Sequence, residues 1–110
     1  MEPVQVPEAL AAGTAQYPEG FRRRGGRIRD SEGALAFYQN HFDFYADSGA
    51  TMRYQYREIQ SYSLKPGFIV RRLTNLKLHR IDGSTVRFRV GSEMAANAGF
   101  ILAAKGITRA

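Results

Sequence analysis

From residue 25 onward, apolar and polar residues alternate along the chain, which is the pattern of strands buried on one face. The clearest stretch is 86–90, where valine and phenylalanine alternate with two arginines. The Asp82-Gly83 pair before it is typical of a hairpin turn, and Asp47-Ser48-Gly49 is a second turn. The pattern predicts seven strands, over residues 25–30, 34–39, 42–46, 51–62, 68–73, 76–81 and 86–90. The alternation in 51–62 changes phase near Glu58, which favours a β-bulge there.

The last part of the chain has a helical pattern instead. Ser92 is a candidate N-cap, Glu93 suits the first helical turn, and Gly106 is a candidate stop. Four apolar residues between them share one helical face: Met94, Ala98, Ile101 and Leu102. A helix with one apolar stripe must cover something, and we expect it to cover an open end of the curled sheet.

Residues 1–20 differ from the remainder in composition. They contain three prolines, three acids and no base, a charge of −3, whereas residues 21–110 hold all 16 bases and seven acids, a charge of +9. We therefore expect an acidic arm over 1–20, loosely ordered or with a short helix over 8–12, and one domain over 21–110. Opposite charge favours an arm that folds back on the body or exchanges between the subunits of a homodimer.

The composition also limits the chemistry. With 110 residues the chain fits one small domain, and the absence of cysteine excludes disulfides, thiolate metal sites and cysteine nucleophiles. The carboxylates and the two histidines lack nucleophile–base or metal-ligand spacing, and no glycine-rich phosphate loop is present. We expect no enzyme, cofactor or metal. The longest near-apolar run, 98–104, is too short for a membrane span, and without an export signal we expect a cytoplasmic protein, with peripheral membrane attachment as an extension.

The order of these elements resembles the pleckstrin-homology-like superfamily, in particular its GRAM-type and bacterial PH-like branches. The resemblance rests on 33–44, similar to the family's apolar hairpin, on 54–62, similar to its next strand, and on the closing hairpin and helix from 76 onward. It implies a mainly β fold: a seven-stranded, bent antiparallel barrel or sandwich capped by one C-terminal helix. Phosphoinositide-binding members carry bases in the first strand connection, whereas residues 30–33 are acidic here. The resemblance therefore implies a non-catalytic adaptor acting through protein contacts or self-association.

Thirteen of the 16 bases are arginine, the residue that makes forked contacts with phosphate and carboxylate. One candidate anion-binding group precedes the second predicted strand, and comprises Arg22, Arg23, Arg24, Arg27 and Arg29. A second is a basic stripe across the last hairpin, with Lys77, Arg87 and Arg89 beside His79. The alternatives are a charged edge strand that resists aggregation and an ordinary solvated face.

Two further groups have a structural and a functional interpretation. Phe68 and Ile69, followed by Arg71 and Arg72, suit a loop that contacts an anionic membrane or a partner, or a strand that enters the core. Aromatic residues interleaved with arginine also suit an OB-type, single-strand-binding barrel, although that fold has five strands and no terminal helix. The expected partner is a protein or a second copy of the chain, and the alternative is acidic lipid or nucleic acid.

Overall fold

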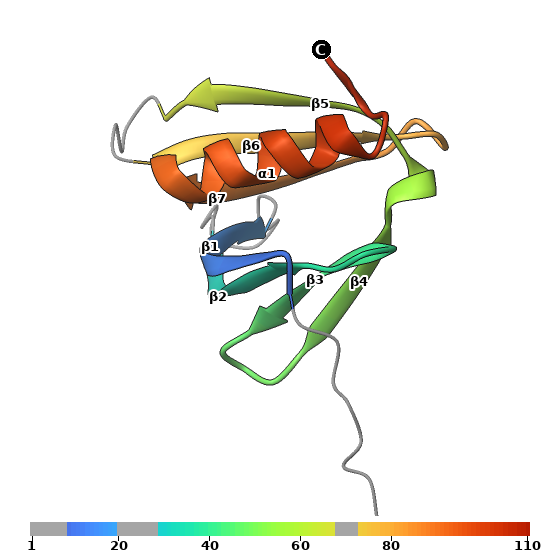
Figure 1. Ribbon diagram of the computed structural model, residues 1–110. Helices are drawn as coiled ribbons and strands as arrows, with labels where there is room; N and C mark the ends of the chain where they lie inside the picture. Colours follow the sequence, from blue (N-terminus) through green and yellow to red (C-terminus); the bar gives the residue numbers. More distant parts are fainter. Residues whose placement is uncertain (1–8, 20–28, 68–72) are drawn as a thin grey trace, which may run out of the picture.

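The computed structural model describes residues 9–19, 29–67 and 73–110 (Figure 1). Eight strands form one sheet in this part of the chain. They are β1 (Ala11–Glu19), β2 (Arg29–Phe37), β3 (His41–Ala46), β4 (Thr51–Gln55), β5 (Ile59–Pro66), β6 (Leu73–Arg80), β7 (Thr85–Gly91) and β8 (Thr108–Arg109). A short 3-10 helix, η1 (Tyr56–Glu58), separates β4 from β5, and the helix α1 (Ser92–Ala104) follows β7.

The expectation of a mainly β fold with one C-terminal helix is confirmed, but its finer description is not. The sheet has eight strands in the order β4-β3-β2-β1-β7-β6-β5-β8. It is a mixed sheet, because β8 pairs with β5 in parallel and the other pairs are antiparallel. Over the described residues β4 and β8 remain edge strands, so the sheet does not close into the expected barrel.

The two halves of the sheet pack against each other through aromatic rings. In Figure 1, β1–β4 form the lower half and β5–β7 the upper half. The Phe88 ring of β7 lies 5.4 Å from that of Tyr17, 5.4 Å from that of Phe44 and 6.0 Å from that of Tyr54, centroid to centroid. Phe88 and Phe44 have no exposed surface. Because Tyr17, Phe44 and Tyr54 all belong to the lower half, Phe88 is the central contact between the halves.

Helix α1 packs its apolar stripe on the inner face of the sheet, and the expected position over an open end of a barrel is not confirmed. Met94, Ala98, Ile101 and Leu102 are all buried. Gly106 ends the helical segment with a φ of +82°, a conformation that glycine adopts without strain. One detail was wrong: the N-cap position is Gly91, without a side-chain capping hydrogen bond, and Ser92 is already helical.

The prediction of a loosely ordered arm over residues 1–20 is wrong for residues 11–19, whereas residues 1–8 and 20 lie outside the described part of the chain. Residues 11–19 form β1, which lies in the middle of the sheet between β2 and β7. Its sequence hides this role because it is rich in alanine and glycine, which have low strand propensity. One of them packs closely against the helix, since a Cβ on Gly13 would lie 3.3 Å from the Met94 sulfur of α1.

Two other expectations about connections were also wrong. Residues 30–33 are not a turn, because β2 runs through them in register with β1. At Gly33 an added Cβ would lie 2.1 Å from the Tyr45 carbonyl oxygen, so β2 and β3 approach too closely there for any side chain. Residues 51–62 are not one strand: η1 turns the chain from β4, at one edge of the sheet, to β5 near the other. A register shift between Ile59 and Ser61 does follow the predicted change of phase.

The predicted turns at 47–49 and 82–83 are confirmed, and Gly83 has a φ of +90°. The predictions for residues 25–28 and 68–72 lie outside the described residues.

Candidate functional site

Two like-charged side chains face each other on the outer surface of the upper half-sheet. The β6–β7 register pairs Lys77 with Arg87 directly, and both are exposed. Their chain neighbours Leu76, Leu78 and Phe88 are buried on the opposite face. Strand alternation therefore holds both cations outward, side by side, as the predicted stripe requires.

Among the described residues, β5–β7 present no acidic side chain on the same face as this pair. Lys65 on β5 is a further exposed cation. The other outward positions of β5–β7 around the Lys77–Arg87 pair are uncharged or basic; they are Ser61, Ser63, Asn75, His79, Thr85 and Arg89. We call Lys65, Lys77 and Arg87 the cationic face. Directly opposed like charges repel each other, and only counterions or an anionic partner reduce that repulsion.

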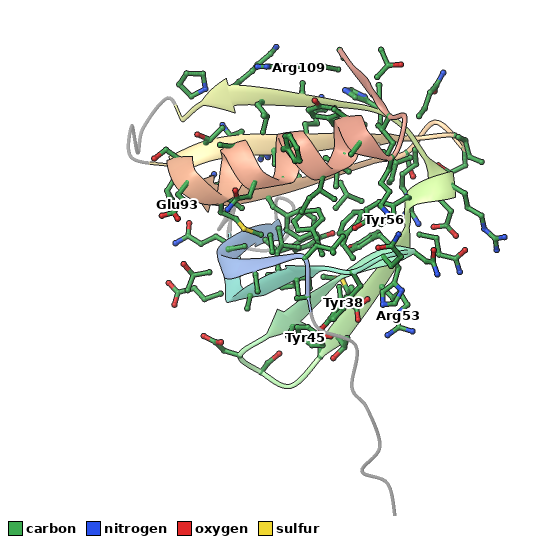
Figure 2. All side chains as sticks on the ribbon, in the orientation of Figure 1. Tyr38, Tyr45, Arg53, Tyr56, Glu93 and Arg109 are labelled. Carbon is green, nitrogen blue, oxygen red and sulfur yellow. The ribbon has the colours of Figure 1, made fainter. Side chains whose placement is uncertain are left out.

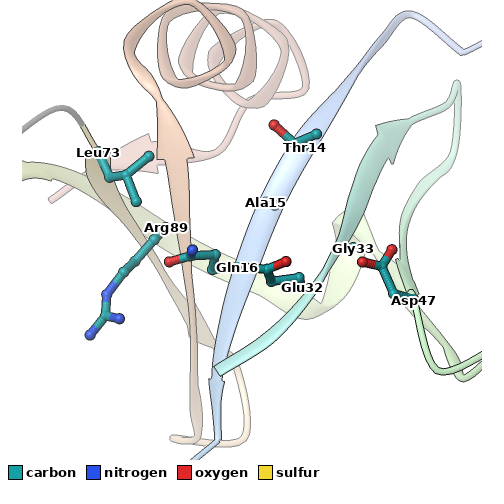
Figure 3. A pocket seen from close by; sticks show the side chains of 8 residues that line it. All are labelled: Thr14, Ala15, Gln16, Glu32, Gly33, Asp47, Leu73 and Arg89. Carbon is teal, nitrogen blue, oxygen red and sulfur yellow. The ribbon is translucent and has the colours of Figure 1, made fainter. Parts of the chain in front are cut away.

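Arg89 differs from the rest of the predicted stripe, because it lines a groove that also contains two acids. Its strand neighbour across β1 is Gln16, which in turn pairs with Glu32. These residues line a groove of about 290 Å³ over β1 (Figure 3), together with Asp47 from the end of β3. With two carboxylates and one guanidinium, this groove does not extend the cationic face.

The remaining predicted site residues are not placed. Residues 20–28 connect β1 to β2 and lie outside the described part of the chain, and they include Arg22, Arg23, Arg24 and Arg27. Arg29 begins β2, but its side chain is also outside that part. The proposed loop residues Phe68, Ile69, Arg71 and Arg72, between β5 and β6, are outside it too.

A polar network that the sequence did not predict covers the outer face of the lower half-sheet (Figure 2). At its centre, the Asp43 side chain is 1% exposed, although it points away from the core. Its Oδ1 accepts a hydrogen bond from Arg53 Nε at 3.0 Å, and its Oδ2 accepts bonds from Arg53 Nη2 at 3.1 Å and the Tyr45 hydroxyl at 3.0 Å. Because Tyr45 donates to Asp43, the Tyr38 hydroxyl donates to Tyr45, 2.9 Å away. His41 Nε2 lies 3.7 Å from Oδ2.

Small neighbours explain how a carboxylate becomes buried on this outer face. Ala36 pairs with Asp43 and Ala34 pairs with Tyr45 across β2 and β3, which leaves space for the tyrosine rings. Burial by itself would raise the pKa of Asp43, but the hydrogen bonds from Arg53 and Tyr45 outweigh it and hold the pKa below its ordinary value. The network is therefore a charged, fully bonded support that fixes Arg53, whose side chain is 61% exposed.

An apolar groove lies between α1 and the start of β1. It has a volume of about 480 Å³, and its lining residues are Leu10, Ala11, Ala12, Asn97, Phe100, Ile101, Ala104 and Lys105. Phe100 is 79% exposed and Leu10 is 51% exposed.

The sequence contained a sign of this groove. Phe100 is the one large apolar residue of α1 that lies off the stripe formed by Met94, Ala98, Ile101 and Leu102. The network around Asp43 was harder to predict from the sequence. Its cross-strand partner Arg53 can be identified only once β3 and β4 are paired in register.

No group of three or more potential metal ligands occurs among the described residues. Their helices include none with the length and apolar character of a membrane span. Neither the scan against protein-family models nor the search of curated proteins gives a match for this chain.

Proposed function

We propose that this chain is a non-catalytic binding module of PH-like architecture, and that the cationic face docks an acidic surface of a protein partner. The observation that carries the proposal is the direct cross-strand pair of Lys77 and Arg87, both exposed and without an acidic neighbour on β5–β7. Such a pair costs stability in the free protein, and an anionic partner recovers that cost.

The shape of the face supports a macromolecular partner. Three neighbouring strands present their pleated outer surface there, and Lys65, Lys77 and Arg87 line neither the groove over β1, nor the one beside η1, nor the one beside α1. A small anion needs a concave site, whereas a protein surface can cover a flat one.

The alternative partner is an acidic lipid surface or nucleic acid, which the same charges would attract. Arg87 of the Lys77–Arg87 pair also supports this alternative, because its guanidinium can bind a phosphate through two hydrogen bonds. The test therefore includes both kinds of probe.

Binding is measured by fluorescence anisotropy or co-sedimentation with three probes: a poly-glutamate peptide, vesicles containing phosphatidylserine, and a single-stranded oligonucleotide. The variant Lys77→Gln/Arg87→Gln is compared with Arg57→Gln/Arg109→Gln, which removes the same charge from exposed positions outside the cationic face. We expect the peptide affinity to fall at least five-fold more in the first variant than in the second, because two adjacent contacts are lost together.

Several results would overturn the proposal. Equal losses in both variants would indicate unspecific charge attraction, and no binding even at low salt would exclude an anionic partner altogether. Selective binding of vesicles or of the oligonucleotide, with the same dependence on Lys77 and Arg87, would replace the protein partner by lipid or nucleic acid.

A further inference from the structure

The outward side of α1 carries very little charge. The exposed residues Glu93, Asn97, Phe100 and Ala104 follow each other at spacings of four, three and four, so they form one stripe along the helix. Glu93 is the only charged member. Phe100 is 79% exposed beside an apolar groove, whereas a solvated helix face usually carries several charges.

This surface has both a projecting group and a hollow. The Phe100 ring projects from the helix, and the adjacent groove is lined by the small side chains of Ala11, Ala12 and Ala104. A surface that pairs with a second copy of itself about a two-fold axis must carry both halves of each contact. The α1 surface meets that condition, because each Phe100 can enter the other copy's groove.

The charges at the two ends of the helix set the direction of pairing. Glu93 lies in the first turn of α1, and Lys105 follows its last residue and lines the groove. In an antiparallel pair, Glu93 of one copy approaches Lys105 of the other at both ends. The midpoint between positions 93 and 105 is position 99, so the axis would pass beside Phe100. A parallel pair would instead bring like charges together, which is unfavourable.

We propose that α1 is a self-association surface: two copies of the chain pack their α1 helices antiparallel, with each Phe100 ring in the other copy's groove. This proposal is independent of the cationic face, which lies on the outer surface of β5–β7, whereas α1 packs on the inner one.

The size of the surface predicts a weak dimer. The 13 residues of α1 span only about 20 Å. Each Phe100 ring buries on the order of 150 Å², against about 800 Å² per partner in a standard interface. We therefore expect a dissociation constant on the order of tens of micromolar.

Sedimentation velocity and light scattering measure the oligomeric state of the full chain at concentrations from about 1 μM to about 500 μM, a range that brackets the expected dissociation constant. We expect a monomer at the low end and a dimer at the high end. Phe100→Gln should weaken the dimer at least ten-fold, because it removes the central aromatic contact. Ile81→Gln is the matched control, since Ile81 is 68% exposed in the β6–β7 turn and does not line the groove, so its loss should leave the dimer unchanged.

Charge reversal tests the antiparallel arrangement. Glu93→Lys and Lys105→Glu should each weaken the dimer, and the double variant should restore it, because opposite charges then face each other again. Circular dichroism of each variant shows whether α1 remains folded.

The outcomes separate this inference from the proposed function. A protein that stays monomeric, or a dimer that Phe100→Gln leaves intact, overturns the inference and leaves the peptide-binding test of the cationic face unaffected. A chain without residues 1–8 keeps β1 and all the described contacts of α1. If that truncation alone creates the dimer, the natural occupant of the groove is the chain's own N-terminal segment, which also overturns the inference.

Discussion

Substitution of Asp43 by asparagine should destabilise the protein far more than its position on the outer sheet face suggests. The carboxylate accepts three hydrogen bonds and is 1% exposed. In Asp43→Asn one oxygen becomes an amide donor that faces donors on Arg53 or Tyr45, so at least one charge-assisted bond is lost. Such bonds contribute about 1.5–3 kcal/mol each. Water can reach the exposed Arg53 and replace part of that contribution, so we expect a loss of about 2 kcal/mol.

Urea unfolding at neutral pH measures this loss. With a slope of about 2 kcal/mol per M, the midpoint should fall by about 1 M, and the melting temperature by about 8 °C. Asp82→Asn is the control, because Asp82 is exposed and bonds only to Ser84 in its own turn. Asparagine can keep those bonds, so the control midpoint should hardly change. If Asp43→Asn behaves like the control, the network does not stabilise the fold as we argue.

The same carboxylate predicts a dependence on acid. The pKa of Asp43 is lower in the folded protein than its ordinary value of 3.8, so its contribution to stability is complete above 3.8 and is lost as the pH falls through the lower folded value. The difference in stability between the wild type and Asp43→Asn should therefore be constant from neutral pH down to about 5 and should shrink below about 4. A difference that grows in acid would contradict the assigned sign.

Three further substitutions, one of them with a matched control, test the core and the strand contacts. Gly33→Ala should lower the free energy of unfolding, measured in urea, by about 3 kcal/mol or more, because its methyl group would lie 2.1 Å from the Tyr45 carbonyl oxygen. Gly91→Ala is the control and should change stability little, since a methyl group there would meet no atom within 4 Å. Phe88→Ala should cost about 3–5 kcal/mol, since the ring lies between the two half-sheets; a loss below about 1 kcal/mol would contradict that position. Burial raises the pKa of Tyr56 to about 12, so stability should fall between pH 10 and about 12, and Tyr56→Phe should remove one late-ionising tyrosine from an ultraviolet titration.

The sequence was sufficient to predict the elements whose residues respond mainly to their own periodicity. The alternation in 86–90 became β7, and the stripe from Met94 to Leu102 became the buried side of α1. In both segments burial repeats along the chain at the period of the local structure, so no knowledge of the neighbours is needed.

The sequence was insufficient where neighbours in space decide the structure. β1 is a strand because β2 and β7 supply its hydrogen-bonding partners, and its small residues reflect the approach of Met94. Asp43 is buried because Ala34 and Ala36 on β2 leave room for tyrosine rings, which alternation along β3 alone cannot show.

The candidate surfaces also divide into features that the sequence alone could predict and features that depend on neighbours in space. Lys77 and Arg87 could be placed on the same face of the hairpin from alternation alone, but their direct opposition depends on the three-residue connection 81–83, which pairs His79 with Thr85. The different surroundings of Arg89 could not be predicted in this way, since the two acids that line its groove come from β2 and from the residue after β3. The groove beside Phe100 requires the position of β1, which the sequence did not reveal.

The location of the partner surface is tested most directly by heteronuclear NMR during a titration with the poly-glutamate peptide. We expect the largest changes in amide chemical shift around Lys77 and Arg87 on β6 and β7, with α1 and the Asp43 network unaffected. Changes that spread evenly over all exposed arginines and lysines, or that centre on another face, would contradict the proposed docking surface.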